Sequence, residues 1–404
     1  MNVLKMILSG TAVIFVSSGS VLGGGIRPTA DHLSMNSRIG FAVPSVAEIR
    51  NALQHAPHHS KHDDAQYTII DDPNEGYALG QGTFAFGLNS AGAVVGYYDD
   101  GKTHGYERAT DGSYRTVDVG KTGTAAGDIN DKGAIAGQTD FYADPGPKQC
   151  PGFLLTSKGK LKKFEPPDVN GCSEDTFGIG NDNSIVGDYE GNDIRFHGFV
   201  RAKNGAIAVI DAPGAVDTFA SDLNNGGAVA GTYIDDNGYH GYIRAADGTF
   251  TTFDAPGGAC CDPANRINNL GGVEGDYSDP GGVNHGLIRN PDGSLVVYDA
   301  LDAGKGAGQG TYGFAGINDA GTVAGYYLDA NNVSHGYVRS SDGTLTEFDP
   351  PGSIWTVAWD INANGVVTGT YMDQFANFHG FLRAHDGTAA ARHKGRQPMR
   401  RQKN

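Results

Sequence analysis

The chain has 404 residues, a formal net charge of −16 and 62 glycines. The acidic balance argues against a nucleic-acid-binding protein, because such proteins neutralise phosphates with clustered Lys and Arg. The many Gly, Tyr, Phe, Val and Thr residues favour short strands and tight turns and exclude a mainly helical fold.

The N-terminal segment has the pattern of a secretory signal peptide, which we assign to residues 1–24. Lys5 supplies the positive charge, and the apolar run from Met6 to Val16 is too short to span a bilayer. Cleavage is expected near Ser20 or Gly24. No cysteine directly follows the run, and no later stretch is apolar enough to cross a membrane. We therefore predict a secreted, periplasmic or cell-surface protein without a lipid anchor or transmembrane segment.

Residues 25–65 are predicted to be a linker with one short helix in the stretch PSVAEIRNALQHA. Ser45 can cap this helix, and Glu48 completes a capping box. The histidine-rich stretch that follows could bind Zn²⁺ or Ni²⁺, or could simply be polar. Its histidines are His55, His58, His59 and His62. At the other end of the chain, residues 389–404 form a basic tail that we expect to be disordered.

Between these flanks the chain repeats one pattern, which three landmarks define. The first is a Gly that closes a small apolar triplet, as in AVVG and TVAG, and its copies end at Gly96, Gly137, Gly187, Gly231, Gly275, Gly325 and Gly369. The second is His-Gly-apolar-X-Arg, which begins at His104, His197, His240, His285, His335 and His379. The second repeat departs from it, with Pro151 and Leu155 in the places of His and Arg. The third is a short strand that ends in an acid, at Asp71, Asp118, Glu165, Asp211, Asp254, Asp299 and Asp349.

A repeat of roughly 45 residues with four short strands is typical of a β-propeller blade. We therefore predict an all-β fold, a seven-bladed β-propeller over residues 67–388. The first element, Tyr67 to Asp71, is a fourth strand without a blade before it, and the last repeat lacks a fourth strand. The N-terminal strand is thus expected to close the ring, which removes exposed sheet edges. A linear β-solenoid is the competing interpretation.

The recurring N-x-x-G-x-V-x-G, followed by H-G-[FY]-x-R and an Asp-Gly turn, resembles the HAF-type extracellular repeats of bacterial exported proteins. The resemblance covers about residues 67–388. It implies export and a propeller-like repeat fold, and it implies no established reaction, cofactor or catalytic residue.

We predict that the repeated polar residues hold the scaffold, because a catalytic residue is needed only once. Each His is expected to bond the backbone or the acid of the adjoining strand, and each Arg to pair with the acid that ends the fourth strand. The Gly that ends the first landmark is expected to allow close packing or a bulge. The Asn of motifs such as INDAG is expected to serve the hairpin turn through its side chain.

The connections that vary in length, between the second and third strands and between successive blades, are predicted to lie on one rim, where binding usually resides. The candidate ligand-binding residues there are Asp99, Asp100, Asp140, Asp235, Asp236, Asp279, Asp329, Asp373, Tyr77 and Tyr312. They could form a carbohydrate site or a Ca²⁺ site near the channel, or they could only keep an exported protein soluble. The ligand spacing of an EF-hand loop is absent.

The four cysteines are predicted to fall on the same rim. Cys150 and Cys172 belong to neighbouring loops, and export permits a structural disulfide between them. Cys260 and Cys261 are expected either to form a vicinal disulfide or to stay reduced.

The sequence favours an exported, non-catalytic binding or interaction module whose ligand is a carbohydrate or a cell-surface protein. The alternative is a propeller enzyme, a lyase or glycosidase acting on polysaccharide, which needs an acid or base that breaks the repeat on the channel face. Candidates in the irregular segments are Glu75, Tyr77, Glu174 and Asp175. None has a partner at diagnostic spacing, and the sequence contains no G-x-S-x-G, HExxH or Walker motif, so no catalytic residue is assigned.

Overall fold

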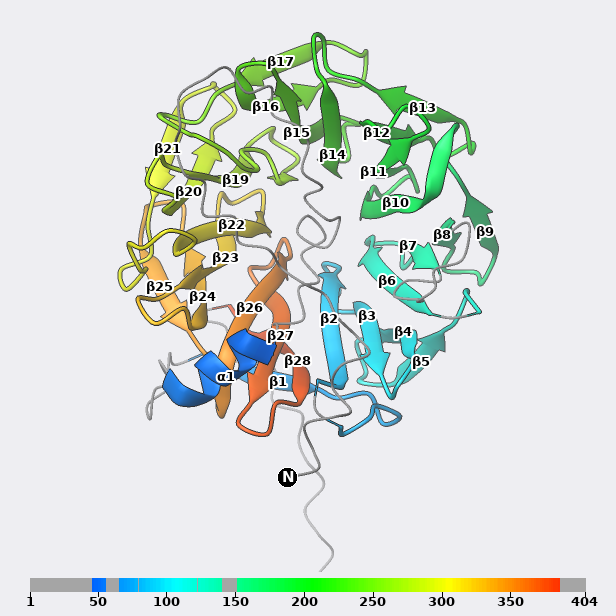
Figure 1. Ribbon diagram of the computed structural model, residues 1–404. Helices are drawn as coiled ribbons and strands as arrows, with labels where there is room; N and C mark the ends of the chain where they lie inside the picture. The colour runs from blue at the N-terminus through cyan, green and yellow to red at the C-terminus, as the bar shows by residue number, and fades with distance from the viewer. Residues whose placement is uncertain (1–45, 56–64, 79, 122, 140–150, 386–404) are drawn as a thin grey trace, which may run out of the picture.

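Seven four-stranded antiparallel sheets surround a central channel in the computed structural model, which describes residues 46–55, 65–78, 80–121, 123–139 and 151–385 (Figure 1). Within each sheet the strands follow one another from the channel outwards. The predicted all-β propeller fold is confirmed, and the linear solenoid is excluded because β1 and β2 both pair with β28. Single parallel contacts also join blade seven to blade one, between Phe378 and Gly82, and blade five to blade six, between Asn284 and Gly310.

The strands are named in chain order. Blade one contains β2 (Gly82–Leu88), β3 (Val94–Asp99), β4 (Thr103–Arg108) and β5 (Tyr114–Val117). Blade two contains β6 (Thr124–Ile129), β7 (Ile135–Thr139), β8 (Gly152–Leu155) and β9 (Leu161–Phe164). Blade three contains β10 (Val169–Ile179), β11 (Ile185–Gly191), β12 (Phe196–Arg201) and β13 (Ile207–Ile210). Blade four contains β14 (Asp217–Leu223), β15 (Val229–Asp235), β16 (Gly238–Arg244) and β17 (Phe250–Phe253).

The remaining blades follow the same order. Blade five contains β18 (Arg266–Ile267), β19 (Val273–Ser278), β20 (Asn284–Arg289) and β21 (Leu295–Tyr298). Blade six contains β22 (Gly310–Ile317), β23 (Val323–Leu328), β24 (Ser334–Arg339) and β25 (Leu345–Phe348). Blade seven contains β26 (Ser353–Ile361), β27 (Val367–Asp373), β28 (Phe378–Arg383) and, from the N-terminal end, β1 (Tyr67–Ile70). Blade five is exceptional, because its inner strand β18 is only two residues long.

The ring closes through the N-terminal strand. β1 pairs antiparallel with β28, with Tyr67 opposite Arg383 and Ile70 opposite Gly380. Two segments from opposite ends of the described chain therefore complete one blade, as the count of fourth strands predicted. Closure leaves no outer strand missing in blade seven and so removes an edge that would otherwise be open to another chain.

The Gly of the first landmark lies opposite a β-bulge in the inner strand. In blade four the ladder between β14 and β15 shifts register between Ala220 and Asp222. A Cβ atom on Gly231 would lie 2.0 Å from the carbonyl oxygen of Phe219, which leaves no room for a side chain. A Cβ would also lie within 2.4 Å of an inner-strand carbonyl oxygen at Gly96, Gly137, Gly325 and Gly369. The predicted bulge role of this Gly is confirmed.

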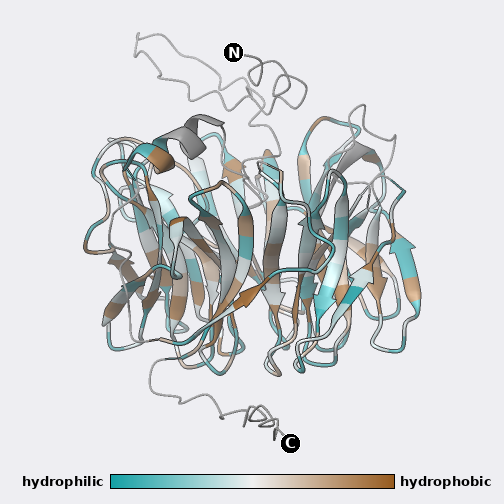
Figure 2. Cartoon of the chain, turned by 90° about the horizontal axis from the view of Figure 1, so that it is seen from below, coloured by the Kyte–Doolittle hydropathy of each residue, from teal (hydrophilic) through white to brown (hydrophobic). Residues whose placement is uncertain are grey.

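The hydrophobic core is divided into layers between neighbouring blades. Between blades seven and one, a buried cluster unites Ile70 of the closing strand with Ala85, Leu88, Val94 and Tyr106 of blade one. Similar clusters fill the other blade junctions. Seen from the side, apolar residues lie along the strands and hydrophilic residues gather in the loops of both faces (Figure 2). Each blade is therefore held mainly by its two neighbours.

A belt of asparagine side chains ties together the turns after the inner strands. Oδ1 of Asn89 accepts the N–H groups of Ala91 and Ala93 in its own turn, and Nδ2 donates to the carbonyl oxygen of Asn130 in the next blade. The same link to the next blade is made by Asn130, Asn224, Asn268, Asn318 and Asn362. Blade three has Gly180 in this position. The predicted turn role is confirmed, and the structure adds a role in joining blades.

Helix α1 (Val46–His55) lies near blades six and seven, on the rim opposite the asparagine belt (Figure 1). Nδ2 of Asn51 donates to the carbonyl oxygen of Asn331 in the loop after β23, and Ala52 is buried in one cluster with Ala376. Among the described residues, no helix is long and apolar enough to cross a membrane. The predicted signal peptide, the histidines His58, His59 and His62, and the basic tail lie outside the described residues.

Candidate functional site

The repeated histidines form identical scaffold units. His335 Nδ1 lies 2.8 Å from Asp349, the acid that follows the fourth strand. Its Nε2 atom lies 3.8 Å from Asp329, in the loop between β23 and β24. The ring of Tyr327 stacks on the imidazole at 5.1 Å between ring centroids. The corresponding His–acid pairs are His104–Asp118, His197–Asp211, His240–Asp254, His285–Asp299 and His379–Asp71. The predicted bond between each His and the adjoining acid is confirmed in these blades.

The prediction that the repeated Arg pairs with the same acid is wrong. In blade six Gly336 lies opposite Phe348, whereas Arg339 lies opposite Leu345, at the far end of the strand pair from Asp349. Four residues of strand span roughly 13 Å, so His and Arg cannot reach one acid. Arg339 instead stacks over the ring of Tyr298 in the preceding blade, with its Cζ atom 5.1 Å from the centroid. Arg201, Arg289 and Arg383 pack in the same way on Phe164, Phe253 and Phe348.

Most of the candidate acids on the variable rim have a scaffold contact. Asp329 accepts the N–H groups of Asn331 and Val333 in its own loop, in addition to its contact with His335. The other acids that cap their own loop are Asp99, Asp100, Asp235, Asp279 and Asp373. Of these, Asp100, Asp235, Asp279 and Asp373 also lie near the Nε2 atom of their blade's His. These acids are distributed around the ring, each within its own blade.

The remaining candidates on this rim are spread apart. Tyr77 is 76% exposed, whereas Tyr312 stacks on Tyr326, accepts a hydrogen bond from Asn284 and donates one to the carbonyl oxygen of Gly308. Asp236 is part of the loop between β15 and β16. Asp140, Cys150 and the side chains of Cys172, Glu174 and Asp175 lie outside the described part of the chain. The predicted disulfide between Cys150 and Cys172 therefore stays a prediction.

Of the two alternatives for Cys260 and Cys261, the structure contains the vicinal disulfide. Cys260 and Cys261 form a disulfide in the segment that precedes β18. Ser278 on β19 holds this segment by two backbone hydrogen bonds. Its N–H donates to the carbonyl oxygen of Cys260, and its carbonyl oxygen accepts the N–H of Ala259. The disulfide thus lies in the irregular segment that takes the place of the inner strand in blade five.

A ring of seven equivalent residues surrounds the channel where the inner strands end, and one of them is an arginine. In chain order the ring consists of Gly87, Asp128, Gly178, Asp222, Arg266, Gly316 and Asp360. Each of its acids bonds the backbone of two blades. Asp222, for example, accepts the N–H of Leu223 through Oδ1 and that of Ile267 in the next blade through Oδ2. A Cβ on Gly178 would lie 2.8 Å from Oδ1 of Asp222, so the glycine makes room for the carboxylate.

The acids of this ring lie close enough to influence one another and are buried from solvent. Burial raises the pKa of Asp222 to about 6 and that of Asp360 to about 8, and the Arg266 guanidinium opposes both shifts. Beyond the ring, the channel widens into a funnel with a cavity volume of about 220 Å³. The funnel is lined by the ring acids and by the asparagine belt in the turns after the inner strands. The funnel opens on the rim opposite the one that carries the candidate acids.

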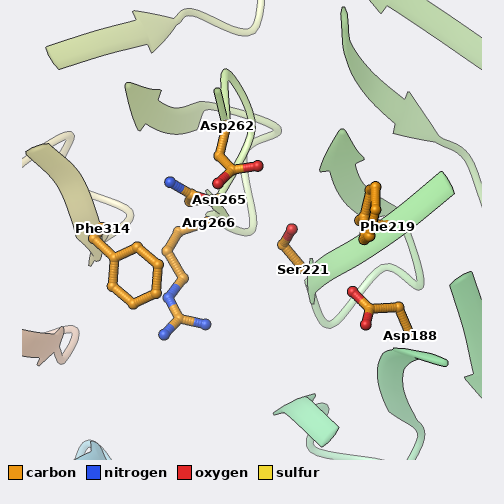
Figure 3. A pocket seen from close by; sticks show the side chains of 7 residues that line it. All are labelled: Asp188, Phe219, Ser221, Asp262, Asn265, Arg266 and Phe314. Atoms are coloured by element: carbon orange, nitrogen blue, oxygen red, sulfur yellow. The ribbon is translucent and has the colours of Figure 1, made fainter. Parts of the chain in front are cut away.

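Next to the ring, the channel wall of blades three to six forms a small pocket around Arg266. Its walls are Asp188, Phe219, Ser221, Asp262, Asn265, Arg266 and Phe314, and its volume is about 30 Å³ (Figure 3). The Arg266 side chain extends into this space, and its Cζ atom lies 5.8 Å from the centroid of the Phe314 ring. A pocket of this size accepts a group such as one hydroxyl, while a larger ligand would extend into the channel.

Behind this wall lie two buried acids on strand β19, Glu274 and Asp276. Glu274 is 0% exposed, and neither of its carboxylate oxygens has a hydrogen-bond partner among the described residues. Burial, reinforced by the charge of Asp276, raises the pKa of Glu274 well above its usual range, against the influence of Arg266. Asp276 accepts a hydrogen bond from Asn265, which joins it to the pocket wall. Burial therefore favours the uncharged form of the Glu274 carboxyl group.

Sequence reasoning missed Arg266 and Glu274, although the repeats contain the signal. The first landmark reads AVVG, AIAG or TVAG in other blades and GVEG in blade five, so Glu274 stands where other blades have a small or apolar residue. Arg266 likewise stands before Ile-Asn where other blades have Gly or Asp. An alignment of the repeats position by position identifies both as departures. At the channel wall the repeat is thus broken in blade five by Arg266, with Glu274 paired behind it on β19.

No protein-family model matches the chain, and no curated protein matches it, so the resemblance to HAF-type repeats stays a prediction. Solved structures match it as propellers. A streptogramin B lyase structure is 12% identical with a TM-score of 0.50, over 78% of this chain and 97% of that chain. The β-propeller domain of the Trilobed protease from Pyrococcus furiosus is 12% identical with a TM-score of 0.50, over 76% and 94%. At these identities the likeness shows the propeller fold alone.

Proposed function

We propose that the chain is an exported, non-catalytic binding propeller that takes a carbohydrate in its central channel, with Arg266 as the anchoring contact. The observation that carries this proposal is the cluster of polar and aromatic side chains around Arg266, which stands where the other blades have Gly or Asp, in one sector of the channel wall. Residues that recur in every blade serve the ring, so a ligand site is expected where one blade differs.

The charges of the channel favour a neutral ligand. Asp128, Asp222 and Asp360 surround the channel next to the pocket, and Asp188 and Asp262 belong to its wall. An anionic polysaccharide would be repelled by the carboxylates of Asp188 and Asp262 in the pocket wall. A neutral sugar offers hydroxyl groups that donate to carboxylates and accept from a guanidinium. Its less polar face can pack on aromatic rings such as those of Phe219 and Phe314 in the same pocket.

Burial of the strongest acid candidates supports binding rather than catalysis. Glu274 has the raised pKa that a general acid needs, but it is 0% exposed and cannot contact a substrate. Asp276 is 6% exposed and is bonded to Asn265. Glu75 lies on the rim opposite the funnel, in the loop between β1 and β2. A lyase or glycosidase would require an acid or base that reaches the channel, and the acids of the ring already accept two backbone N–H groups each.

Export is part of the same proposal. It is supported by the signal-peptide pattern of residues 1–24, by the HAF-like motifs and by the disulfide between Cys260 and Cys261, a bond that persists in oxidising compartments.

A glycan array followed by titration of each hit tests this function. Substitution Arg266→Gln removes the cation and keeps a shorter polar side chain. We expect the affinity for a bound neutral glycan to fall at least about tenfold, because a charge-assisted hydrogen bond is worth about 1.5–3 kcal/mol. The matched control is Arg115→Gln on the outer strand β5, where Arg115 pairs with Glu107, and it should bind as the wild type does. Ser221→Ala is a milder second variant of the pocket.

Two outcomes would overturn the proposal. One is unchanged affinity in Arg266→Gln together with Ser221→Ala, measured well below the melting temperature of each variant. The other is turnover of a polysaccharide by the wild type in a parallel activity screen, which would establish the enzyme alternative.

A further inference from the structure

We propose that Asp71, Glu75 and His379 form a binding site for a divalent transition metal at the seam where the N-terminal strand closes the ring. One ligand atom from each side chain lies within 4.8 Å of the other two. Asp71 follows β1, Glu75 belongs to the loop between β1 and β2, and His379 is on β28. The three ligands therefore come from the two ends of the propeller that meet at the seam.

The loop that carries Glu75 has a structural twin elsewhere in the ring. Residues 71–83 lead from blade seven to blade one, and residues 299–311 lead from blade five to blade six. In both loops the second residue donates its N–H to a threonine hydroxyl at 2.8 Å, Asp72 to Thr83 and Ala300 to Thr311. In both loops a glycine N–H also bonds the end of the neighbouring second strand. The two loops thus share one backbone path, and their positions correspond one to one.

The seam loop differs from its twin by two buried carboxylates. Asp72 stands where the twin has Ala300, and Glu75 stands where it has Ala303. Asp72 is 1% exposed, and its Oδ2 atom has no hydrogen-bond partner among the described residues. Glu75 is 7% exposed and accepts a hydrogen bond from the Thr83 hydroxyl. The backbone therefore does not require these acids, and buried carboxylates are costly unless a cation compensates them.

The electrostatics of the cluster show the same shortage of positive charge. Glu75 lies beside the acids Asp71 and Asp72, and His379 is the basic side chain of the cluster. His379 Nδ1 lies 2.8 Å from Asp71, as in the other blades, and Nε2 lies 3.6 Å from Asp373. In blade five the corresponding His285–Asp299 pair faces Ala303 and has no third ligand of this kind.

The ligand set selects the class of metal. One imidazole and two carboxylates suit Zn²⁺ or a similar first-row ion, whereas Ca²⁺ and Mg²⁺ prefer oxygen ligands alone. A bound ion would link β1 to β28 through Asp71 and His379 and would neutralise Glu75. The site would therefore stabilise the closed ring, independently of the ligand proposed for the channel.

Zn²⁺ titration of the metal-stripped full-length chain tests this site. The wild type should bind one equivalent of Zn²⁺ more than Glu75→Ala, the variant that gives the seam loop the residue of its twin. At a free Zn²⁺ concentration of one hundred times the dissociation constant, the melting temperature of the wild type should rise by about 5 °C, and that of the variant should not. Glu75→Gln serves as a second variant with the size of the side chain retained.

The twin loop supplies the matched control. His379→Asn should lose the same equivalent as Glu75→Ala, whereas His285→Asn in the twin should lose none. Any Zn²⁺ bound by His55, His58, His59 and His62 is common to all variants and cancels in the difference. Equal stoichiometry in the wild type, Glu75→Ala and Glu75→Gln would overturn the proposal, as would an equal loss in His285→Asn.

Discussion

At the scale of single residues, the propeller uses one polar unit repeatedly. A histidine between two aspartates, covered by a tyrosine ring, recurs in most blades, as at His240 with Asp235 and Asp254. Blade two lacks His, and it also has Thr139 where the tyrosine stands in the other blades. The joint loss supports the view that these side chains act as one structural unit.

The first prediction concerns the charge of His335. Burial opposes the charged imidazole, but the hydrogen bonds to Asp329 and Asp349 outweigh it and raise the pKa to about 9. The folded-state pKa lies above the usual value of about 6.5, so this contribution to stability is complete below about pH 6.5 and is lost as the pH rises through about 9. His335→Asn should therefore lower the melting temperature strongly at pH 6 and much less at pH 9.5. A difference between the two proteins that stays constant across this range would contradict the assignment.

The second prediction concerns the gap in the asparagine belt at Gly180. A Cβ there meets no atom closer than 3.5 Å, and the turn from Gly180 to Ser184 has the hydrogen bond of the other turns. Asp182 already accepts the N–H of Ser184, so Gly180→Asn should add only the link to blade four. It should also reduce the freedom of the unfolded chain. We expect a gain of about 0.5–1.5 kcal/mol in the free energy of unfolding. Denaturant unfolding measures it, and a loss of stability would show that the belt does not carry this energy.

At the scale of elements, the closing strand β1 matters more than its length suggests. It contributes a fourth strand to blade seven, the partner of His379, and a buried side chain, Ile70, to the layer between blades seven and one. The inner strands matter through their ends, where the ring of Gly, Asp and Arg joins each blade to the next. Blade five differs, since a disulfide-containing segment takes the place of most of its inner strand.

The third prediction concerns β1. Ile70 is 0% exposed, whereas the adjacent Ile69 faces outwards and is 38% exposed. Ile70→Ala should lower the free energy of unfolding by about 2–5 kcal/mol, because a cavity remains at the seam. The same change at Ile69 should stay within about 0.5 kcal/mol. Equal effects of the two substitutions in denaturant unfolding would mean that the strand is not packed into the ring.

At the scale of the whole molecule, the periodic part of the sequence was sufficient to predict the fold. The excess N-terminal strand predicted ring closure, and the recurrence of His predicted a scaffold bond to the backbone or to the acid of the adjoining strand. The Arg was misassigned because sharing a strand face with His says nothing about which end of the partner strand each one reaches. Acids such as Asp329 were proposed as ligand-binding residues because a turn cap and a binding acid look alike in sequence. Arg266 and Glu274 were missed because a repeat pattern emphasises what recurs, and a site depends on what does not.

Hydrogen–deuterium exchange of the glycan-bound propeller tests most directly whether the channel wall around Arg266 is the binding site. We predict that a bound neutral glycan slows amide exchange in residues 219–223 and 262–268, which contribute Phe219, Ser221, Asp262 and Arg266 to the pocket, and leaves the loop at residues 329–334 unchanged. Slower exchange confined to that loop and its equivalents on the opposite rim would contradict the account.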